Sequence, residues 1–208
     1  PDTVLYDPFC GSGTMLIESA MHVMRIAPGL RRRFAAEKWD WLPQTVWQQE
    51  RQRAFDLIKR DATFRAYGSD IDPAAVELAQ YNAKQAGVGT RIEIVQRDVK
   101  DFYMPDEKGV VICNPPYGER LLDLKTAQEI YETMGKVFSQ GYPHRYYIIS
   151  PDMEFEKSFG RMADKRRKLY NGMIPCQLYM YFKEEQKKAP KPSRAKPYPD
   201  RRDHRIKK

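Results

Sequence analysis

Short apolar or β-branched segments alternate with helix-like segments along most of this chain, and this alternation restricts the fold more than any other feature. Neighbouring parallel strands need a crossover connection, which is usually a helix. The pattern therefore predicts an α/β fold in which helices cover both faces of a mostly parallel sheet. The expected strands cover residues 3–6, 64–68, 92–95, 110–113, 146–149, 167–170 and 177–182, and the expected helices begin near residue 15 and cover 73–86 and 126–138.

The last two of these seven strands flank Asn171–Gly172, a dipeptide that favours tight turns, so we expect an antiparallel hairpin at the sheet edge. The helix over 73–86 has clear end signals. Asp72 is suited to the N-cap and Pro73 to the first helical position, and Gly87 is suited to ending the helix. Its apolar stripe consists of Val76, Ala79, Ala83 and Ala86.

A basic and aromatic insertion interrupts the alternation over about residues 25–63. Within it, residues 44–61 have the pattern of a polar amphipathic helix. A chain of 208 residues is long enough for one compact core but too short for two full-sized domains. We therefore predict one domain over residues 1–182, with the insertion inside it.

The formal net charge of +8 lies mostly at the end of the chain. Residues 183–208 contain eleven Lys or Arg and four Asp or Glu, which gives +7 and leaves about +1 for the rest. This segment has four prolines and almost no aliphatic residues, so it cannot bury enough apolar surface to offset its chain entropy. We expect a disordered tail, which is either a solubilising terminus or a basic arm that grips phosphates.

The cysteines and histidines are scattered, without the spacing of a zinc site or of a disulfide scaffold. Cys10, Cys113 and Cys176 form no Cys-x-x-Cys pair, so we expect no metal and a reducing, cytoplasmic setting. No segment approaches the length of a membrane span, and the start lacks the pattern of a signal peptide. We therefore expect neither a secreted disulfide protein nor a membrane protein.

A glycine-containing loop follows the first expected strand, at the place where open α/β sheets bind ligands. Gly11 and Gly13 allow its backbone to approach a ligand without a Cβ clash. No Gly-Lys-Ser/Thr follows, so this is not a phosphate-binding P-loop, and the dinucleotide fingerprint is incomplete. Asp7 would repel a pyrophosphate but attract an ammonium group. The loop comprises Asp7, Pro8, Phe9, Cys10, Gly11, Ser12, Gly13 and Thr14.

Two further acids follow the next two expected strands. Asp70 stands where an acid typically accepts hydrogen bonds from ribose hydroxyls, and Asp98 stands where an acid can accept from the amine of adenine. Each acid alone can be a helix cap or a loop residue. Together with Asp7, the three suit a ligand with ammonium, ribose and adenine groups and no phosphate, and S-adenosylmethionine is such a ligand.

Asn114-Pro115-Pro116-Tyr117 follows the fourth expected strand and is the most specific pattern in the chain. A planar exocyclic amine is a poor nucleophile because its lone pair is delocalised into the ring. The side-chain oxygen of Asn114 and the carbonyl of Pro115 can accept its two hydrogens and favour the pyramidal, nucleophilic geometry. Tyr117 offers a ring on which a base can stack. A proline-rich turn is the alternative interpretation.

At these residues the chain resembles the class I S-adenosylmethionine-dependent methyltransferases of the amino-methylating kind, which have a Rossmann-like fold. Asn-Pro-Pro-Tyr is the catalytic motif of that family, so the resemblance implies catalytic roles for Asn114, Pro115, Pro116 and Tyr117. It also implies S-adenosyl-L-methionine as the cofactor and S-adenosyl-L-homocysteine as its product. The implied cofactor-binding residues are Asp7, Pro8, Phe9, Cys10, Gly11, Ser12, Gly13, Thr14, Asp70, Ile71, Asp98, Val99 and Asn114.

A narrower resemblance is to the THUMP-domain RNA guanine-N2 methyltransferases, in particular those acting on 23S ribosomal RNA. It implies methyl transfer to guanine N2 in large-subunit ribosomal RNA. Family members carry an N-terminal RNA-binding region with a THUMP domain, so we expect this chain, which begins at Pro1, to be the catalytic part of a longer protein. The residues that carry this resemblance are 7–14, 26–30, Phe34, Trp39, 114–121 and 169–172.

The same motif serves adenine-N6 methyltransferases acting on RNA or DNA and glutamine-amide methyltransferases acting on proteins, so it does not separate these substrates. A non-enzymatic RNA-binding assembly factor is a further alternative, against which the intact acids and motif argue. The basic clusters either hold an RNA backbone or form solvated faces. The candidate RNA-binding residues are Arg31, Arg32, Arg33, Arg120, Lys165, Arg166, Arg167 and Lys168.

Overall fold

The structure, a computed structural model, describes residues 4–104, 109–117, 124–139 and 145–182 of the 208-residue chain. Two features singled out in the sequence, Arg120 and the basic tail over 183–208, lie outside the described residues.

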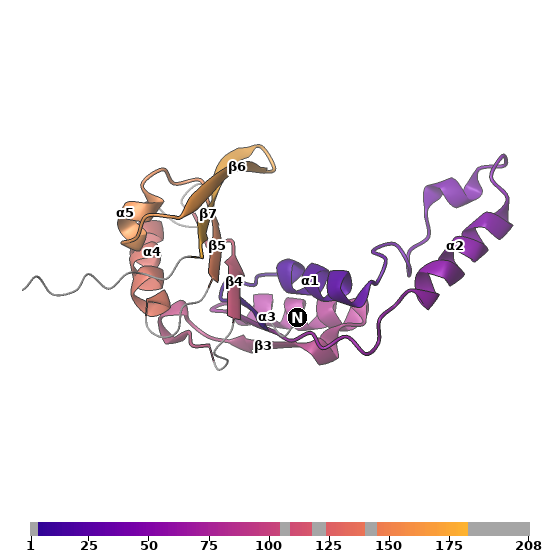
Figure 1. Cartoon of the computed structure of the whole chain (residues 1–208), viewed down its shortest axis with the longest axis horizontal. Coiled ribbons are helices and arrows are strands. Elements are labelled where there is room, and N and C mark those ends of the chain that lie inside the picture. Colours follow the sequence, from indigo (N-terminus) through magenta and orange to yellow (C-terminus); the bar gives the residue numbers. More distant parts are fainter. Residues whose placement is uncertain (1–3, 105–108, 118–123, 140–144, 183–208) are drawn as a thin grey trace, which may run out of the picture.

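A seven-stranded sheet in the order β3-β2-β1-β4-β5-β7-β6 forms the centre of the protein (Figure 1). The first five strands are parallel, and β7 is antiparallel to both of its neighbours. The predicted mostly parallel sheet with a C-terminal antiparallel hairpin is therefore confirmed. The strands are β1 Val4–Asp7, β2 Ala66–Asp70, β3 Ile92–Gln96, β4 Gly109–Cys113, β5 Arg145–Ser150, β6 Lys165–Asn171 and β7 Ile174–Tyr181.

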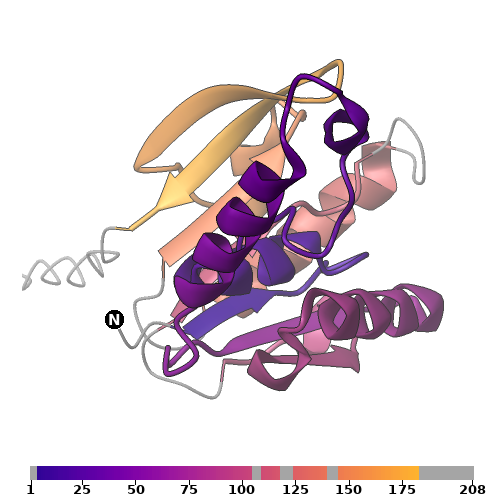
Figure 2. The same ribbon diagram turned by 90° about the vertical axis from the view of Figure 1, so that its right-hand side faces the viewer.

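Helices cover both faces of this sheet, as the alternating pattern predicted (Figures 1 and 2). Helices α1 (Thr14–Met24) and α3 (Pro73–Ala86) contribute to one buried apolar cluster, whereas α4 (Leu124–Phe138) and α5 (Phe155–Phe159) contribute to another. The described residues include no helix that is long and apolar enough to cross a membrane. Three short 3-10 helices complete the described elements: η1 Ala35–Lys38, η2 Gly89–Arg91 and η3 Val99–Asp101.

The ends of α3 follow the capping signals in the sequence. The Asp72 side chain accepts a hydrogen bond from the backbone N–H of Ala74 at 2.9 Å, and Pro73 is the first helical residue. Gly87 ends the helix at φ +77°, in the left-handed region. This helix therefore has the limits that its sequence predicts.

The ends of some other strands differ from the prediction because tertiary contacts determine where they lie. Strand β2 ends at Asp70 rather than at residue 68 because its pairing with β3 continues as far as Asp70 opposite Gln96. The hairpin strands are longer and their turn is shorter than expected, since Asn171 pairs with Ile174. Helix α5 was not predicted, because five residues give no periodic signal.

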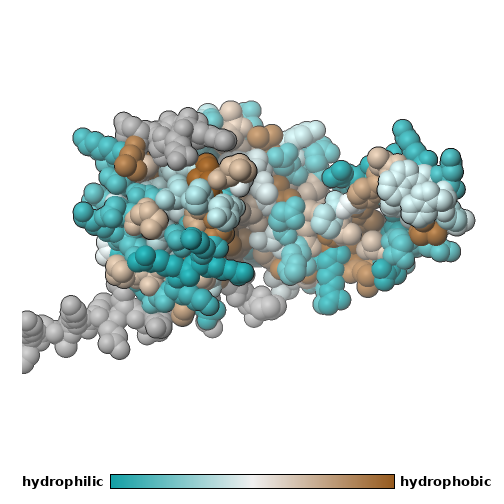
Figure 3. Space-filling view, turned by 90° about the horizontal axis from the view of Figure 1, so that it is seen from above, coloured by the Kyte–Doolittle hydropathy of each residue, from teal (hydrophilic) through white to brown (hydrophobic). Residues whose placement is uncertain are grey.

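The insertion stands away from the sheet as an arm that contains η1 and α2, Gln44–Asp56 (Figure 1, right). None of the residues of α2 is fully buried. In the view from above, the body is largely hydrophilic and hydrophobic residues lie along the arm (Figure 3). Helix α2 ends before the expected residue 61, and Lys59 N–H then donates to the Met24 carbonyl at 2.8 Å, which joins the returning chain to α1.

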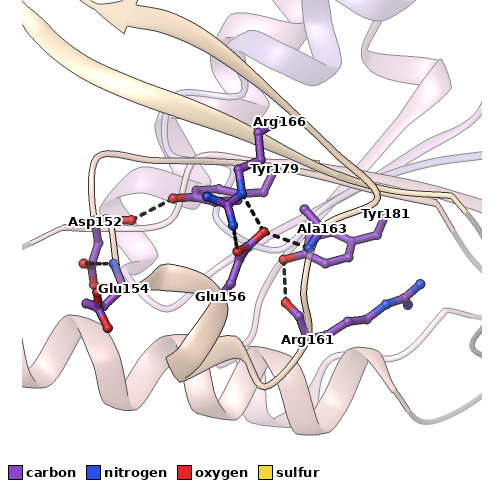
Figure 4. A network of polar contacts seen from close by, with 8 residues as sticks. All are labelled: Asp152, Glu154, Glu156, Arg161, Ala163, Arg166, Tyr179 and Tyr181. Carbon is purple, nitrogen blue, oxygen red and sulfur yellow. Dashed lines mark hydrogen bonds and ion pairs between the residues drawn. The ribbon is translucent and has the colours of Figure 1, made fainter.

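A network of polar contacts holds the C-terminal hairpin against α5 (Figure 4). The buried Glu156 carboxylate accepts hydrogen bonds from Ala163 N–H at 2.8 Å and from Arg166 Nε at 2.9 Å, and it also pairs with Arg166 Nη2. The Tyr179 hydroxyl donates to the Asp152 carbonyl at 2.9 Å. These contacts fix the hairpin relative to the rest of the sheet.

Candidate functional site

The predicted site residues lie at one edge of the sheet. Strands β3, β2, β1 and β4 are neighbours and run parallel, so their carboxyl ends meet at the same edge. Asp98, Asp70, Asp7 and Asn114 stand at or just after these four ends. The structure therefore orders them along the edge as the sequence argument requires, with Asn114 next to the Asp7 loop.

The loop after β1 is tied to β2 by backbone and side-chain contacts. Cys10 N–H donates to the Ser69 carbonyl at 2.9 Å, and Gly11 N–H donates to Asp70 Oδ2 at 2.9 Å. Gly11 and Gly13 have φ angles of +51° and +80°, which other residues adopt at a cost. The loop is thus held in one conformation directly before α1 begins.

Asp7 is a buried carboxyl at the start of this loop. Its exposed fraction is 2%, and its Oδ1 accepts a hydrogen bond from Phe9 N–H at 3.1 Å. Burial raises its pKa to about 7, the Phe9 N–H opposes this rise, and the nearby Asp70 adds to it. A cation bound beside Asp7 would favour its ionised form, so the position suits a positively charged ligand group.

Asp70 and its neighbour offer features that fit a nucleoside. Both Asp70 oxygens accept backbone hydrogen bonds, Oδ2 from Gly11 and Oδ1 from Asp72 N–H at 3.1 Å. Each carboxylate oxygen has a second lone pair, so each can accept one more hydrogen bond, as ribose hydroxyls require. The Ile71 side chain is 65% exposed, which provides an apolar surface next to the acid.

Asp98 also has a local structural role. Its Oδ1 accepts from Lys100 N–H at 3.0 Å and its Oδ2 lies 3.3 Å from Lys100 Nζ, so it caps η3. These contacts with Lys100, led by the backbone hydrogen bond, lower the pKa of Asp98. The neighbouring Val99 side chain is buried in the core, so only its main chain could contact a ligand at this edge. The same is true of Pro8 and Cys10 in the loop.

Asn114 has an unusual acceptor. Its Oδ1 is buried and, among the residues that the structure describes, has no hydrogen-bond partner. A buried polar atom without a partner costs about 1–3 kcal/mol, and such atoms are few in native proteins. An amine hydrogen of a bound ligand would supply the missing partner. The adjoining Pro115 is fully buried.

Two residues outside the predicted site contact this motif. The Tyr131 hydroxyl of α4 lies 3.4 Å from the Pro116 carbonyl and accepts from Ser150 Oγ at 3.2 Å. Asn171 Nδ2 donates to the Tyr117 hydroxyl oxygen at 2.8 Å. Asn171 belongs to the Leu-Tyr-Asn-Gly segment that contributed to the family resemblance, which was the one available signal. Nothing in the sequence indicated Tyr131.

The predicted RNA-binding clusters lie apart. Arg31 Nη1 donates to the Gln85 carbonyl of α3 at 3.0 Å, so this cluster lies on the side of β2 and β3. Residues 165–168 form most of β6, at the opposite end of the sheet. All four of these residues are exposed, but the charge of Arg166 is compensated by Glu156.

The sheet order, the antiparallel β7 and the ligand-type loop after β1 together define a class I methyltransferase fold. The family described as "RMKL-like, methyltransferase domain" matches residues 1–180, and the chain belongs to this family. The resemblance found in the sequence is thereby confirmed at the level of the family.

Individual relatives agree with this assignment. YpsC of Bacillus subtilis, named as a candidate RNA methyltransferase, is 40% identical over 88% of this chain and 47% of its own length. "Ribosomal RNA large subunit methyltransferase K/L" of Shewanella amazonensis is 41% identical over 85% of this chain and 26% of its own length. SMU.472, a candidate methyltransferase solved as a complex with SAH, is 41% identical, has a TM-score of 0.84, and is matched over 88% of this chain and 49% of its own. This chain thus spans about half the length, or less, of these relatives.

Proposed function

We propose that this protein transfers a methyl group from S-adenosylmethionine to the exocyclic N2 amine of a guanine in RNA, with large-subunit ribosomal RNA as the substrate. The observation that carries the proposal is the buried, unpartnered Oδ1 of Asn114 at the end of β4. An acceptor without a partner matches the amine hydrogens of such a substrate. Its neighbours Pro115 and Pro116 have no N–H that would compete for it.

The cofactor site in this proposal extends along the edge from β4 to β3. Asp7 would hold the ammonium group, and the free lone pairs of Asp70 would accept from the ribose hydroxyls. Ile71 would contact the adenine ring, and Asp98 would accept from the adenine amine. The buried acid, the partly free acid and the exposed apolar side chain fit the three parts of S-adenosylmethionine. The name of the SMU.472 complex, which contains the demethylated product, supports this choice.

The residues of this chain act by positioning and polarisation. When bound, S-adenosylmethionine supplies a methyl group that is already activated by its sulfonium charge. Asn114 Oδ1 and the Pro115 carbonyl accept the amine hydrogens and localise the nitrogen lone pair toward the methyl group. Tyr117 stacks on the base, which must be unpaired or flipped out to reach it. The names of YpsC, a candidate RNA methyltransferase, and of the ribosomal RNA large subunit methyltransferase K/L support RNA as the substrate.

The test measures methyl transfer from labelled S-adenosylmethionine to unmodified ribosomal RNA, followed by nucleoside digestion and mass analysis. Asn114→Ala should lower the rate at saturating cofactor by roughly 10²–10³-fold, because the amine loses its acceptor. Gln85→Ala, which removes an exposed amide of α3, is the control and should match the wild type.

The modified nucleoside identifies the substrate. N2-methylguanosine that disappears in Asn114→Ala supports the proposal. N6-methyladenosine would retain the reaction type and overturn the guanine assignment. Absence of any RNA product, with transfer to a protein amide or to DNA, would overturn RNA as the substrate. A protein that binds RNA without turnover would indicate the assembly-factor alternative.

A further inference from the structure

The turn of the C-terminal hairpin lies at the same edge of the sheet as the proposed catalytic motif. Strand β6 is antiparallel to β7, and β7 is antiparallel to β5, so β6 runs in the direction of β4 and β5. Its last residue is Asn171. The carboxyl end of β6 therefore meets the edge at which Asn114 follows β4, although 57 residues separate the two in sequence.

The backbone of Asn171 is paired within the hairpin at this place. Asn171 pairs with Ile174 across a two-residue turn, Gly172–Met173. Gly172 has φ +61° and Met173 does not have a positive φ, which matches the hairpin turns that have glycine at the first central position. The hairpin is in turn anchored to α5 through Arg166 and Glu156 (Figure 4). The Asn171 side chain thus projects from the paired end of β6.

That side chain reaches the proposed stacking residue. Asn171 Nδ2 donates a hydrogen bond of 2.8 Å to the hydroxyl oxygen of Tyr117, at the far end of the tyrosine ring from its backbone. Tyr117 itself follows β4 in a segment without regular structure. A contact at the phenolic oxygen restricts rotation about the Cα–Cβ bond, because that rotation would move the oxygen away from Asn171. A ring held in its binding position loses less entropy when a base stacks on it.

We infer that Asn171 is a positioning residue for the methylation reaction, which holds the Tyr117 ring in the orientation that stacks on the target base. The inference rests on the proposed function, since Tyr117 needs this orientation only if a base binds there. Asn171 does not itself contact the reacting atoms. Tyr170 and Met173 at the same end of the hairpin are 68% and 94% exposed, so a substrate beside the turn could contact them.

A double-mutant cycle in the full-length protein tests the inference. The variants are Asn171→Ala, Tyr117→Phe and the double variant, with methyl transfer measured at saturating RNA and saturating cofactor. Each single variant should lower kcat by roughly three- to tenfold, the range expected for one hydrogen bond, and should leave cofactor affinity unchanged. The double variant should be no slower than either single variant, because both remove the same hydrogen bond.

Two further variants separate positioning from folding. Asn171→Asp retains the hydrogen bond in reverse, since the phenol O–H can donate to the carboxylate, and should restore kcat to near the wild-type value. Gln85→Ala should have no effect. Multiplicative losses in the double variant, a weakened cofactor affinity, or an Asn171→Asp variant as slow as Asn171→Ala would overturn the inference.

The hydrogen bond can also be tested without catalysis, so that failure of the proposed function remains distinguishable. In Tyr117→Phe, the NMR signals of the Asn171 side-chain amide should move, while those of Asn82 should not. A wild type that transfers no methyl group to RNA, together with such a shift, would overturn the proposed function but support the hydrogen bond. An unmoved Asn171 amide would overturn the hydrogen bond itself.

Discussion

At the scale of single residues, the fold strongly changes the acid–base chemistry of Asp7. Burial raises its pKa from 3.8 to about 7, with a further contribution from Asp70 that the Phe9 N–H opposes. Below this value the folded carboxyl carries a proton, which a cationic ligand group must displace. Ligand affinity and protonation are therefore coupled at this position.

We expect the affinity for S-adenosylmethionine to rise with pH up to about 7 and then to level off. The Asp7→Asn variant should lose this pH dependence, and its affinity should be lower by about tenfold or more. The stability of the ligand-free protein has the opposite pH dependence to the affinity. The unfolded carboxyl loses its proton near 3.8, so the free energy of unfolding falls as pH rises from there to about 7. Calorimetric titration and urea unfolding across this range check both effects. A pH-independent affinity of the wild type would contradict the role of Asp7.

The sequence was sufficient to place the polar residues of the site, but not to describe their state. Strand ends can be read from apolar runs, so Asp7, Asp70 and Asn114 could be assigned to one edge of the sheet. The raised pKa of Asp7 and the unpartnered oxygen of Asn114 depend on burial by distant segments. The hydrogen bond between Asn171 and Tyr117 depends on the register of the hairpin, which a sequence pattern fixes only loosely.

At the scale of elements, local sequence signals were again predictable and features set by tertiary packing were not. Helix α3 was predictable because its cap, its proline and its terminal glycine are local signals. Helix α5 was not, because it is stabilised by tertiary packing. Its Phe155 and Phe159 are buried against α4 and the sheet, and its Glu156 binds Arg166. A short segment of this kind gives no information about its structure until its partners are in place.

The approach of α4 to α5 leads to a prediction about Gly135. A Cβ at this position would lie 2.0 Å from the carbonyl oxygen of Phe159, which is backbone and cannot rotate away. Alanine normally stabilises a helix interior by about 1 kcal/mol relative to glycine, whereas overpacking costs about 1–3 kcal/mol. Because a backbone clash is at the upper end of this range, we expect Gly135→Ala to lower the free energy of unfolding.

Urea denaturation of the two proteins measures this change. Glu132→Ala, at an exposed position of the same helix, is the control for helix propensity and should be nearly neutral. A Gly135→Ala variant that is more stable than the wild type would show that α4 and α5 are not as close as the structure has them.

At the scale of the whole molecule, the question is how a body with little net charge would bind the proposed RNA substrate. The basic residues of β6 stand on the edge strand of the sheet, where exposed charge also prevents pairing with other chains. Edge protection alone would require no RNA contact. The two explanations differ in what happens to RNA affinity when the charges are removed.

We expect the triple variant Lys165→Gln, Arg167→Gln and Lys168→Gln to bind RNA more weakly at all sequences, by about tenfold or more at low salt. Its plot of log affinity against log salt should be shallower by about 0.7–0.9 for each RNA phosphate that the variant no longer neutralises. Arg166 is left unchanged because it holds the hairpin to Glu156. Fluorescence anisotropy with labelled ribosomal RNA fragments measures both quantities. The charge-matched control carries Lys84→Gln, Lys125→Gln and Lys136→Gln, at exposed positions of α3 and α4.

The comparison of the two triple variants decides between a local interaction and a general charge effect. Both remove three positive charges, so a long-range electrostatic effect would weaken RNA binding equally. A weakening confined to the β6 variant would place RNA along the edge strand that ends at Asn171, next to the proposed catalytic motif. Unchanged affinity together with self-association of the β6 variant would instead assign these charges to edge protection. Unaltered cofactor binding in both variants would show that the fold is intact.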